Sequence, residues 1–106
     1  MRAWQGESDR VVKSETVRQF WTGCGIPAST WCLGWDRPSA QGSSAGSKWS
    51  RDGVGHLGFT GCSIWIDPAR ARWAILLSNR VYPTRENERI KQFRPILHDA
   101  IFDALS

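Results

Sequence analysis

The segment 55–61, Gly-His-Leu-Gly-Phe-Thr-Gly, carries residue types that could take part in acyl transfer. It places an imidazole two residues before a glycine, at the start of a predicted strand. A glycine in a strand lets another backbone approach closely, and a backbone N–H just after it can point at a developing oxyanion. The pattern therefore nominates His56, Gly58 and Phe59 as residues that contact a substrate. Glycine-rich strand starts are also common without such a site, so a structural role stays open.

The segment 42–46, Gly-Ser-Ser-Ala-Gly, matches the Gly-x-Ser-x-Gly pattern of a nucleophile elbow. An elbow needs a tight turn from a strand into a helix, which holds the serine hydroxyl beside an oxyanion hole. Neither element is predicted at its flanks, and only about 60 residues follow it to supply a triad acid and base. We interpret the segment as a glycine-serine loop.

The histidines and cysteines do not form a metal-binding or redox motif. The two histidines and three cysteines have spacings that match no zinc or dithiol pattern, so we predict no metal and no cofactor. His98 lies in a predicted helix, where we expect a surface or capping role. Cys24, Cys32 and Cys62 cannot all pair within the chain, and we expect reduced or buried thiols.

Length and composition favour one small globular domain. The chain has 106 residues, of which 41% are apolar and 23% charged, with a net charge of +4. These are ordinary values for globular proteins and argue against disorder. No apolar run approaches the ~20 residues of a membrane span. The first ten residues lack the apolar segment of a signal peptide, and the location of the protein stays unknown.

Hydrophobic spacing and turn signals predict an α+β chain that forms a single, partial domain. We expect an irregular lead over 1–13, a helix over 14–22, a long loop over 23–54, a three-stranded antiparallel meander over 55–79, and a loop with a closing helix over 80–106.

The three predicted strands lie at 55–60, 62–67 and 73–77. Alternation in the second strand predicts two faces, one formed by Cys62, Ile64 and Ile66 and the other by Ser63, Trp65 and Asp67. The third strand is apolar on both faces, which predicts a central strand covered on both sides.

The closing helix is predicted from apolar residues at three- and four-residue intervals, namely Ile90, Phe93, Leu97, Ile101 and Leu105. Pro95 fits best in a first helical turn, so the main helix is expected over about 94–104, and a helical turn before it stays open.

One strong helix and one short helix cannot cover so apolar a strand on both faces. The remainder would be a large exposed apolar patch, which is unusual on a soluble monomer. Either the chain self-associates through its sheet or it is part of something larger, and we favour the second.

Several segments, taken in chain order, carry a family likeness. They are Gly-Trp-Asp at 34–36, Ser-Ser-Ala-Gly at 43–46, His-Leu-Gly-Phe-Thr-Gly at 56–61, Ser-Ile-Trp-Ile-Asp-Pro at 63–68, Leu-Leu-Ser-Asn-Arg-Val-Tyr-Pro-Thr-Arg at 76–85 and Arg-Pro-Ile-Leu-His-Asp-Ala at 94–100. Together they resemble the C-terminal section of the serine β-lactamase and penicillin-binding-protein family, closest to its esterase-like and class C-like branch. The resemblance covers roughly residues 14–105.

The resemblance implies a partial β-lactamase-like α/β domain. Members attack an ester or amide carbonyl with the serine of a Ser-x-x-Lys motif, form an acyl-enzyme and release it with water. They also carry a Tyr-x-Asn or Ser-x-Asn motif and a Lys-Thr-Gly or His-Thr-Gly motif. Only the third motif has a counterpart here. His56 takes the place of its cationic residue, Gly58 that of its glycine, and the Phe59 N–H would supply half of the oxyanion hole.

Two departures qualify this likeness. Leu57 stands where the motif has a hydroxyl that helps to hold a substrate carboxylate, which puts β-lactam recognition in doubt. No serine in the chain has a lysine three residues later, and neither Tyr-x-Asn nor Ser-x-Asn occurs. The chain would thus be the C-terminal part of a hydrolase for a small ester, amide or β-lactam, and inactive alone.

Two other functions remain as alternatives. One is a non-enzymatic small protein that binds a partner or a second copy through an exposed sheet edge. The other is nucleic-acid binding, suggested by a basic cluster with tryptophans nearby: Arg80, Arg85, Arg89, Lys91 and Arg94. Acidic residues are interspersed through that cluster, so we expect a solvated face there and no nucleic-acid partner.

Overall fold

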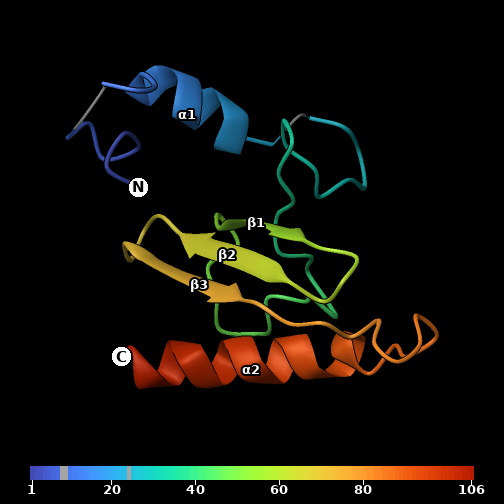
Figure 1. The fold of residues 1–106 in the computed structure, drawn as a ribbon. Coiled ribbons are helices and arrows are strands. Elements are labelled where there is room, and N and C mark those ends of the chain that lie inside the picture. The colour runs from blue at the N-terminus through green and yellow to red at the C-terminus, as the bar shows by residue number, and fades with distance from the viewer. Residues whose placement is uncertain (8–9, 24) are drawn as a thin grey trace.

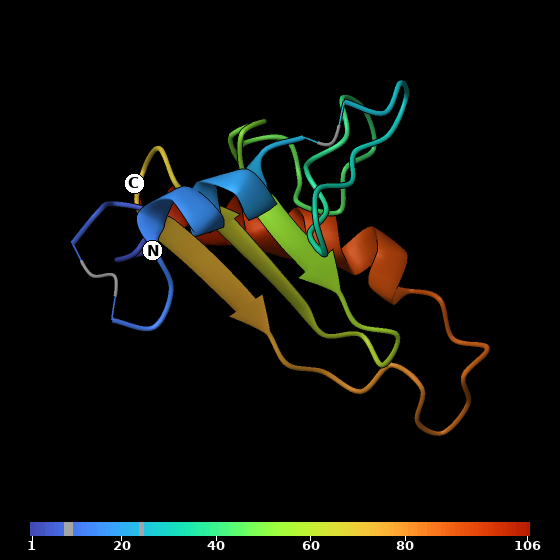
Figure 2. The ribbon, with the colours of Figure 1, turned by 90° about the horizontal axis from the view of Figure 1, so that it is seen from above.

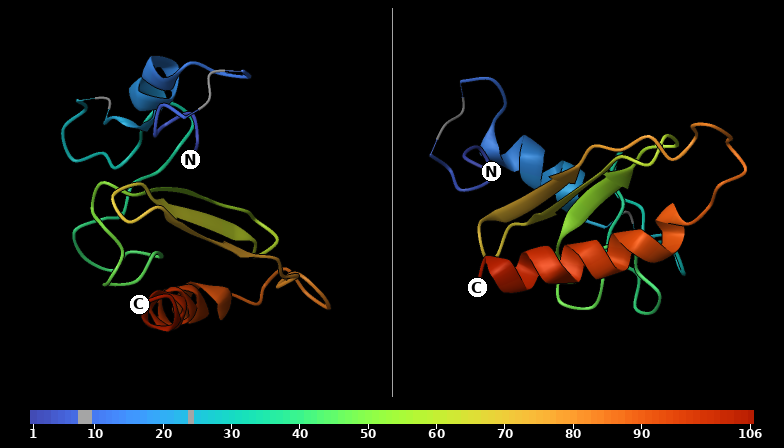
Figure 3. Two further views of the ribbon diagram at one scale, coloured as in Figure 1. Left: turned by 90° about the vertical axis from the view of Figure 1, so that its left-hand side faces the viewer. Right: turned by 60° about the horizontal axis from the view of Figure 1, so that its bottom comes forward.

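A computed structural model describes residues 1–7, 10–23 and 25–106, and these form the α+β fold predicted from the sequence. The elements in chain order are α1 (Ser14–Trp21), β1 (Val54–Leu57), β2 (Ser63–Asp67), β3 (Arg72–Leu76) and α2 (Ile90–Ala104). The strands form an antiparallel meander in the order β1-β2-β3. The sheet lies between two layers, with α2 along one face and α1 over the other (Figures 1 and 3).

The strand register sorts the side chains into cross-strand rows. His56 pairs with Ile64, which pairs with Ile75, and Gly55 pairs in the same way with Trp65 and Ala74. Successive residues of a strand point to opposite faces. The predicted alternation of the second strand is confirmed, since Ser63 and Trp65 contact the α2 layer while Ile64 and Ile66 belong to the opposite core.

The core between the sheet and α2 is built around Trp65, which is 1% exposed. Trp49 and Ala74 pack beside it. Gly55 has to be glycine because a Cβ at that position would collide with the Trp65 ring. The indole N–H of Trp49 donates to the His98 carbonyl at 2.9 Å, which ties the long loop to α2.

The opposite core places α1 on the sheet through tryptophans. Trp21 ends α1 and packs with Val54 and Ile66 of the sheet. Its ring stacks on Trp4 at 5.2 Å and meets the edge of Trp35 at 5.9 Å. Aromatic pairs in these geometries add to the energy of area burial. The short α1 is therefore held by packing, because eight residues are too few for a stable isolated helix.

The long loop is irregular, as predicted, but it is an integral part of both cores. Cys32, Ala45 and Trp49 are buried from this segment. Its backbone also extends the sheet locally, because Asp36 and Gly55 exchange two hydrogen bonds of 2.8 Å each. Cys62 is half-buried, and the expectation for Cys24 falls outside the described residues.

The start predicted for the main closing helix, near residue 94, is too late, and the turn before it, which the sequence left open, is part of the same helix. The helix begins at Ile90 and includes Pro95, although proline cannot donate the usual backbone hydrogen bond. Burial explains its stability, because Ile90, Arg94 and His98 follow one another at four-residue steps and are all buried. Phe93, by contrast, is 49% exposed, so the buried stripe differs from the apolar stripe predicted.

The prediction of a central third strand is also wrong. β3 is an edge strand, and it is covered on only one face. Trp73, Ile75 and Leu77 on the other face are 56%, 57% and 80% exposed. The apolar patch expected from the sequence is therefore present, and it lies along the outer edge of the sheet.

Candidate functional site

The predicted site lies where β1 turns back into β2. The Gly58 N–H donates to the Cys62 carbonyl at 2.8 Å, and the Gly61 N–H donates to the Gly58 carbonyl at 3.0 Å. These bonds close a tight turn with Phe59 and Thr60 at its centre. Gly61 adopts a φ of +108°, where a side chain would be strained, and a Cβ there would also collide with Ser78.

Arg80 contacts both the ring and the carbonyl of Phe59, while the backbone N–H of Phe59 makes no hydrogen bond with a described group. The Arg80 guanidinium lies 4.6 Å from the centre of the Phe59 ring, and Arg80 Nε donates to the Phe59 carbonyl at 2.8 Å. No group within the described ranges accepts the Phe59 N–H. Phe59 as a residue is 66% exposed, and its backbone N–H is a donor that the closed turn holds in a fixed position.

Arg94 fixes the two ends of the same turn from below. Its Nη2 donates to the carbonyls of Gly58 and Cys62, both at 2.9 Å, from a side chain that is 5% exposed. Burial and, secondarily, the charge of Arg80 lower the pKa of Arg94, yet a guanidinium remains protonated. Among the described residues no carboxylate forms an ion pair with it. Its hydrogen bonds to the turn are therefore its main compensation for burial.

His56 is exposed on the sheet face that points away from α2. Its ring meets the edge of Trp31 at 6.1 Å. A shallow hollow of about 250 Å³ begins at His56 and Gly58 and runs across the sheet to Ile75 and Leu77 of β3. The hollow is mostly apolar, and its polar lining residues are His56, Cys62 and Ser63. The three predicted site residues thus share one strand and turn that border an open apolar surface.

A serine–histidine contact that the sequence analysis missed lies beneath the sheet. His98 Nδ1 is 2.8 Å from the Ser44 carbonyl, and because a carbonyl can only accept, Nδ1 carries the proton. Nε2 therefore accepts from the Ser63 hydroxyl at 3.2 Å. Burial lowers the pKa of His98, which keeps the imidazole neutral. The surface role predicted for His98 is wrong, because its side chain is 0% exposed.

The hydrogen bond between the Ser63 hydroxyl and His98 Nε2 resembles that of a serine nucleophile and its base, but the Ser63 hydroxyl is not accessible to a substrate. Ser63 is 4% exposed, so no substrate carbonyl can reach its oxygen. The histidine instead joins α2, β2 and the long loop through neutral hydrogen bonds. The signal in the sequence was the four-residue spacing from Ile90 through Arg94 to His98, which marks a buried helical face that two polar residues share.

The segment 42–46 is a loop, as predicted, and it docks on α2. Gly46 has a φ of +86°, and a Cβ there would lie 2.8 Å from the Pro95 carbonyl oxygen and would collide with Asp99. The Asp99 carboxylate accepts the N–H groups of Ser47 at 2.8 Å and Lys48 at 3.0 Å. The glycine pattern of the apparent elbow thus reflects close packing of a loop against a helix.

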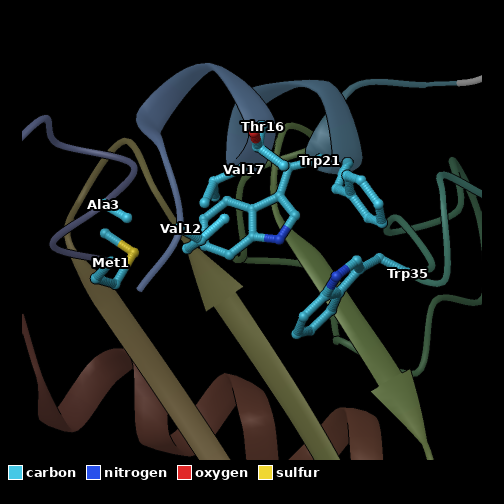
Figure 4. Close-up of a pocket in the computed structure, with 8 residues that line it drawn as sticks. Met1, Ala3, Val12, Thr16, Val17, Trp21 and Trp35 are labelled. Atoms are coloured by element: carbon cyan, nitrogen blue, oxygen red, sulfur yellow. The ribbon is translucent and has the colours of Figure 1, made fainter. Parts of the chain in front are cut away.

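A second, larger hollow of about 350 Å³ lies between α1, the N-terminal residues and Trp35 (Figure 4). Its walls are apolar or aromatic, and their polar side-chain groups are the Thr16 hydroxyl and the indole N–H groups of Trp21 and Trp35. No Asp, Glu, His, Cys, Lys, Arg or Tyr side chain is among its described lining residues.

The described part of the chain contains no group of three or more His, Cys, Asp and Glu side chains placed to hold a metal ion. None of its described helices is long and apolar enough to cross a membrane. Comparisons of the chain with protein-family models, curated proteins and solved structures give no match.

Proposed function

We propose that this chain is the C-terminal part of a β-lactamase-related serine hydrolase that cleaves an ester or amide through an acyl-enzyme. The observation that carries the proposal is the backbone N–H of Phe59, which no described group accepts. It lies in the hydrogen-bonded turn three residues after the exposed His56. Backbone N–H groups fixed in this way stabilise the oxyanion of a tetrahedral intermediate without reorganisation during the reaction. The motifs that resemble the family support the same interpretation.

Each site residue has a distinct role in this proposal. Phe59 donates its N–H to the substrate oxygen as one of the two oxyanion donors. Gly58, which has no side chain, lets the substrate approach the β1 backbone. His56 supplies an imidazole on the open face, at the position of the cationic residue in the family motif.

Leu57 narrows the class of substrate. It packs with the core on the α2 side of the sheet, and as a leucine it offers no hydroxyl to a substrate carboxylate. A β-lactam, whose recognition uses that carboxylate, would be bound less well than a neutral ester or amide. The apolar hollow beside His56 is consistent with an uncharged, apolar substrate group.

The nucleophile and its lysine lie outside this chain in the proposal, because no Ser-x-x-Lys occurs in it. Loss of a nucleophile removes most of the rate enhancement of such an enzyme. We therefore expect no ester hydrolysis by the chain alone and no mass shift after treatment with a fluorophosphonate or penicillin. A clean single adduct would contradict the proposal and would point to Ser44 or a cysteine as nucleophile.

The oxyanion role is tested in the complete hydrolase with two substitutions at one position. Phe59→Pro removes the N–H, and proline suits the first central position of a turn. Phe59→Ala keeps the N–H and removes the ring. We expect Phe59→Pro to lower kcat about 10²–10³-fold, the usual effect of losing one oxyanion donor, and Phe59→Ala to cost far less. Equal kcat values for the two variants would refute the assignment.

A further inference from the structure

The outer edge of β3 is unpaired among the described residues. β3 pairs only with β2, and Figure 2 shows it at the outer margin of the sheet. The opposite edge differs, since β1 is closed by the two hydrogen bonds between Asp36 and Gly55. An unpaired strand edge is a template for another strand.

The hydrogen-bond pattern of the sheet shows which residues of β3 present free backbone groups. The bond from Gly58 to Cys62 and the outward bonds of Gly55 indicate that β2 uses its even-numbered residues to bond β1. Its odd-numbered residues, such as Trp65, therefore bond β3, where Trp65 pairs with Ala74. The backbone N–H and C=O groups of Trp73 and Ile75 consequently point to the open edge.

The side chains on this edge carry none of the usual protection against pairing. Trp73, Ile75 and Leu77 share one face and are each more than half exposed. Natural edge strands are commonly blocked by lysine, by proline or by inward-pointing charges. In β3 and Leu77 the one charged residue is Arg72, at the very start of the strand.

We propose that β3 is the interface of a symmetric homodimer, in which two copies of this chain pair antiparallel about Ile75 to form one continuous sheet. In this register Ile75 lies opposite Ile75 of the second copy, and Trp73 lies opposite Leu77 of the second copy. All these residues have outward backbone groups, so each pair exchanges both of its hydrogen bonds. The apolar faces of the two edges also join into one row.

The edge is self-complementary, which favours a second copy over an unrelated strand. The same register sets Arg72 opposite Ser78 of the second copy, so no like charges face each other within residues 72–78; two positions farther out, Arg70 lies opposite Arg80. A two-fold interface requires this kind of match between a surface and itself.

The contact is small, because the exposed apolar side chains present on the order of 300–400 Å² per copy. The two copies would bury on the order of 600–800 Å² in total, which is less than the roughly 1,000 Å² that stable specific interfaces exceed, so we expect a weak, transient dimer. The net charge of +4 on each chain opposes association, and salt should strengthen it by screening. The inference concerns β3 of this chain and does not rest on the hydrolase proposal, in which the remainder of the enzyme would compete with a second copy for the same apolar face.

Sedimentation velocity from about 1 to 200 µM tests the dimer. We expect a concentration-dependent shift from monomer to dimer that is stronger at higher salt. Ile75→Lys should remain monomeric over that range, while the matched control Ile96→Lys, on the exposed face of α2, should dimerise like the wild type. A wild type that is monomeric throughout, or an Ile75→Lys variant that dimerises equally well, would overturn the proposal.

The register has its own test, which does not depend on tolerance of a charge at position 75. Opposed Cα atoms in such a pair are about 5.5 Å apart, within reach of a disulfide. Under mild oxidation Ile75→Cys should give a covalent dimer in much higher yield than Ile96→Cys, with the native cysteines present in both. Equal yields would show that Ile75 does not lie on the two-fold axis.

Discussion

Replacing Arg94 by methionine should release the turn that presents the Phe59 N–H. Arg94 makes two hydrogen bonds of 2.9 Å from a charged donor to the carbonyls of Gly58 and Cys62. Bonds to charged groups contribute about 1.5–3 kcal/mol each. Methionine fills much of the same volume but leaves both carbonyls without this donor.

The net effect is smaller than the sum of the two bonds. The buried Arg94 Nε has no acceptor among the described residues, and removal of the guanidinium also removes that cost. We therefore expect a loss of about 2–4 kcal/mol in the free energy of unfolding. For a domain of this size that corresponds to a fall in Tm of about 8–16 °C.

Thermal unfolding, which gives Tm, and amide hydrogen exchange, which reports on the turn, together test this prediction. The exchange of the Gly58 and Gly61 amides should accelerate more than that of amides in the middle of α2. Arg89→Met is the matched control, because Arg89 is exposed at the N-terminal end of the same helix and should change stability by less than about 0.5 kcal/mol. If Arg94→Met matches Arg89→Met in Tm and in exchange, Arg94 does not hold the turn.

Two further predictions concern the contact between α2 and the long loop. The pKa of His98 is lowered in the folded state, so the unfolded chain takes up a proton first as pH falls below about 6.5. The contribution of neutral His98 to stability is then fully present above that pH and is lost as pH falls toward the folded-state pKa. Tm should therefore drop more between about pH 7.5 and 5.5 in the wild type than in His98→Gln. Parallel plots of Tm against pH for the two proteins would contradict this prediction. Gly46→Ala should cost about 2–4 kcal/mol, because it strains a positive φ and drives a methyl group against Pro95 and Asp99. Gly42→Ala, with φ +63° and open space around it, isolates the backbone cost of about 1 kcal/mol, and an equal loss in both variants would refute the contact.

The elements of the fold were predictable because they follow local patterns. Alternation over 62–67 and the spacing along the closing helix each depend on neighbours within one element. Both helices, the meander and its turns therefore follow from the sequence. The position of β3 at the edge of the sheet did not follow from the sequence. Apolar residues on both faces of a strand indicate that both faces tend to be buried, but they do not show whether this chain supplies the residues that bury them.

The candidate site was predictable only in part for a related reason. His56, Gly58 and Phe59 are adjacent in sequence, so a local pattern was enough to find them. The groups that hold the turn are distant: Arg94 is 36 residues from Gly58, and Arg80 is 21 residues from Phe59. The burial of His98 was missed in the same way, since its partner Ser44 is 54 residues away. Polar residues become buried when such remote partners satisfy them, and the four-residue spacing from Ile90 to His98 places these residues on one helical face without showing that this face is the buried one.

The DNA sequence upstream of the codon for Met1 tests the central proposal most directly. The proposal predicts an open reading frame that continues upstream, within about a kilobase, and encodes Ser-x-x-Lys followed by Tyr-x-Asn or Ser-x-Asn. The turn at Phe59 would then be one wall of that active site. An in-frame stop immediately before Met1 would contradict the proposal, and the interaction surface at β3 would become the leading account of this chain.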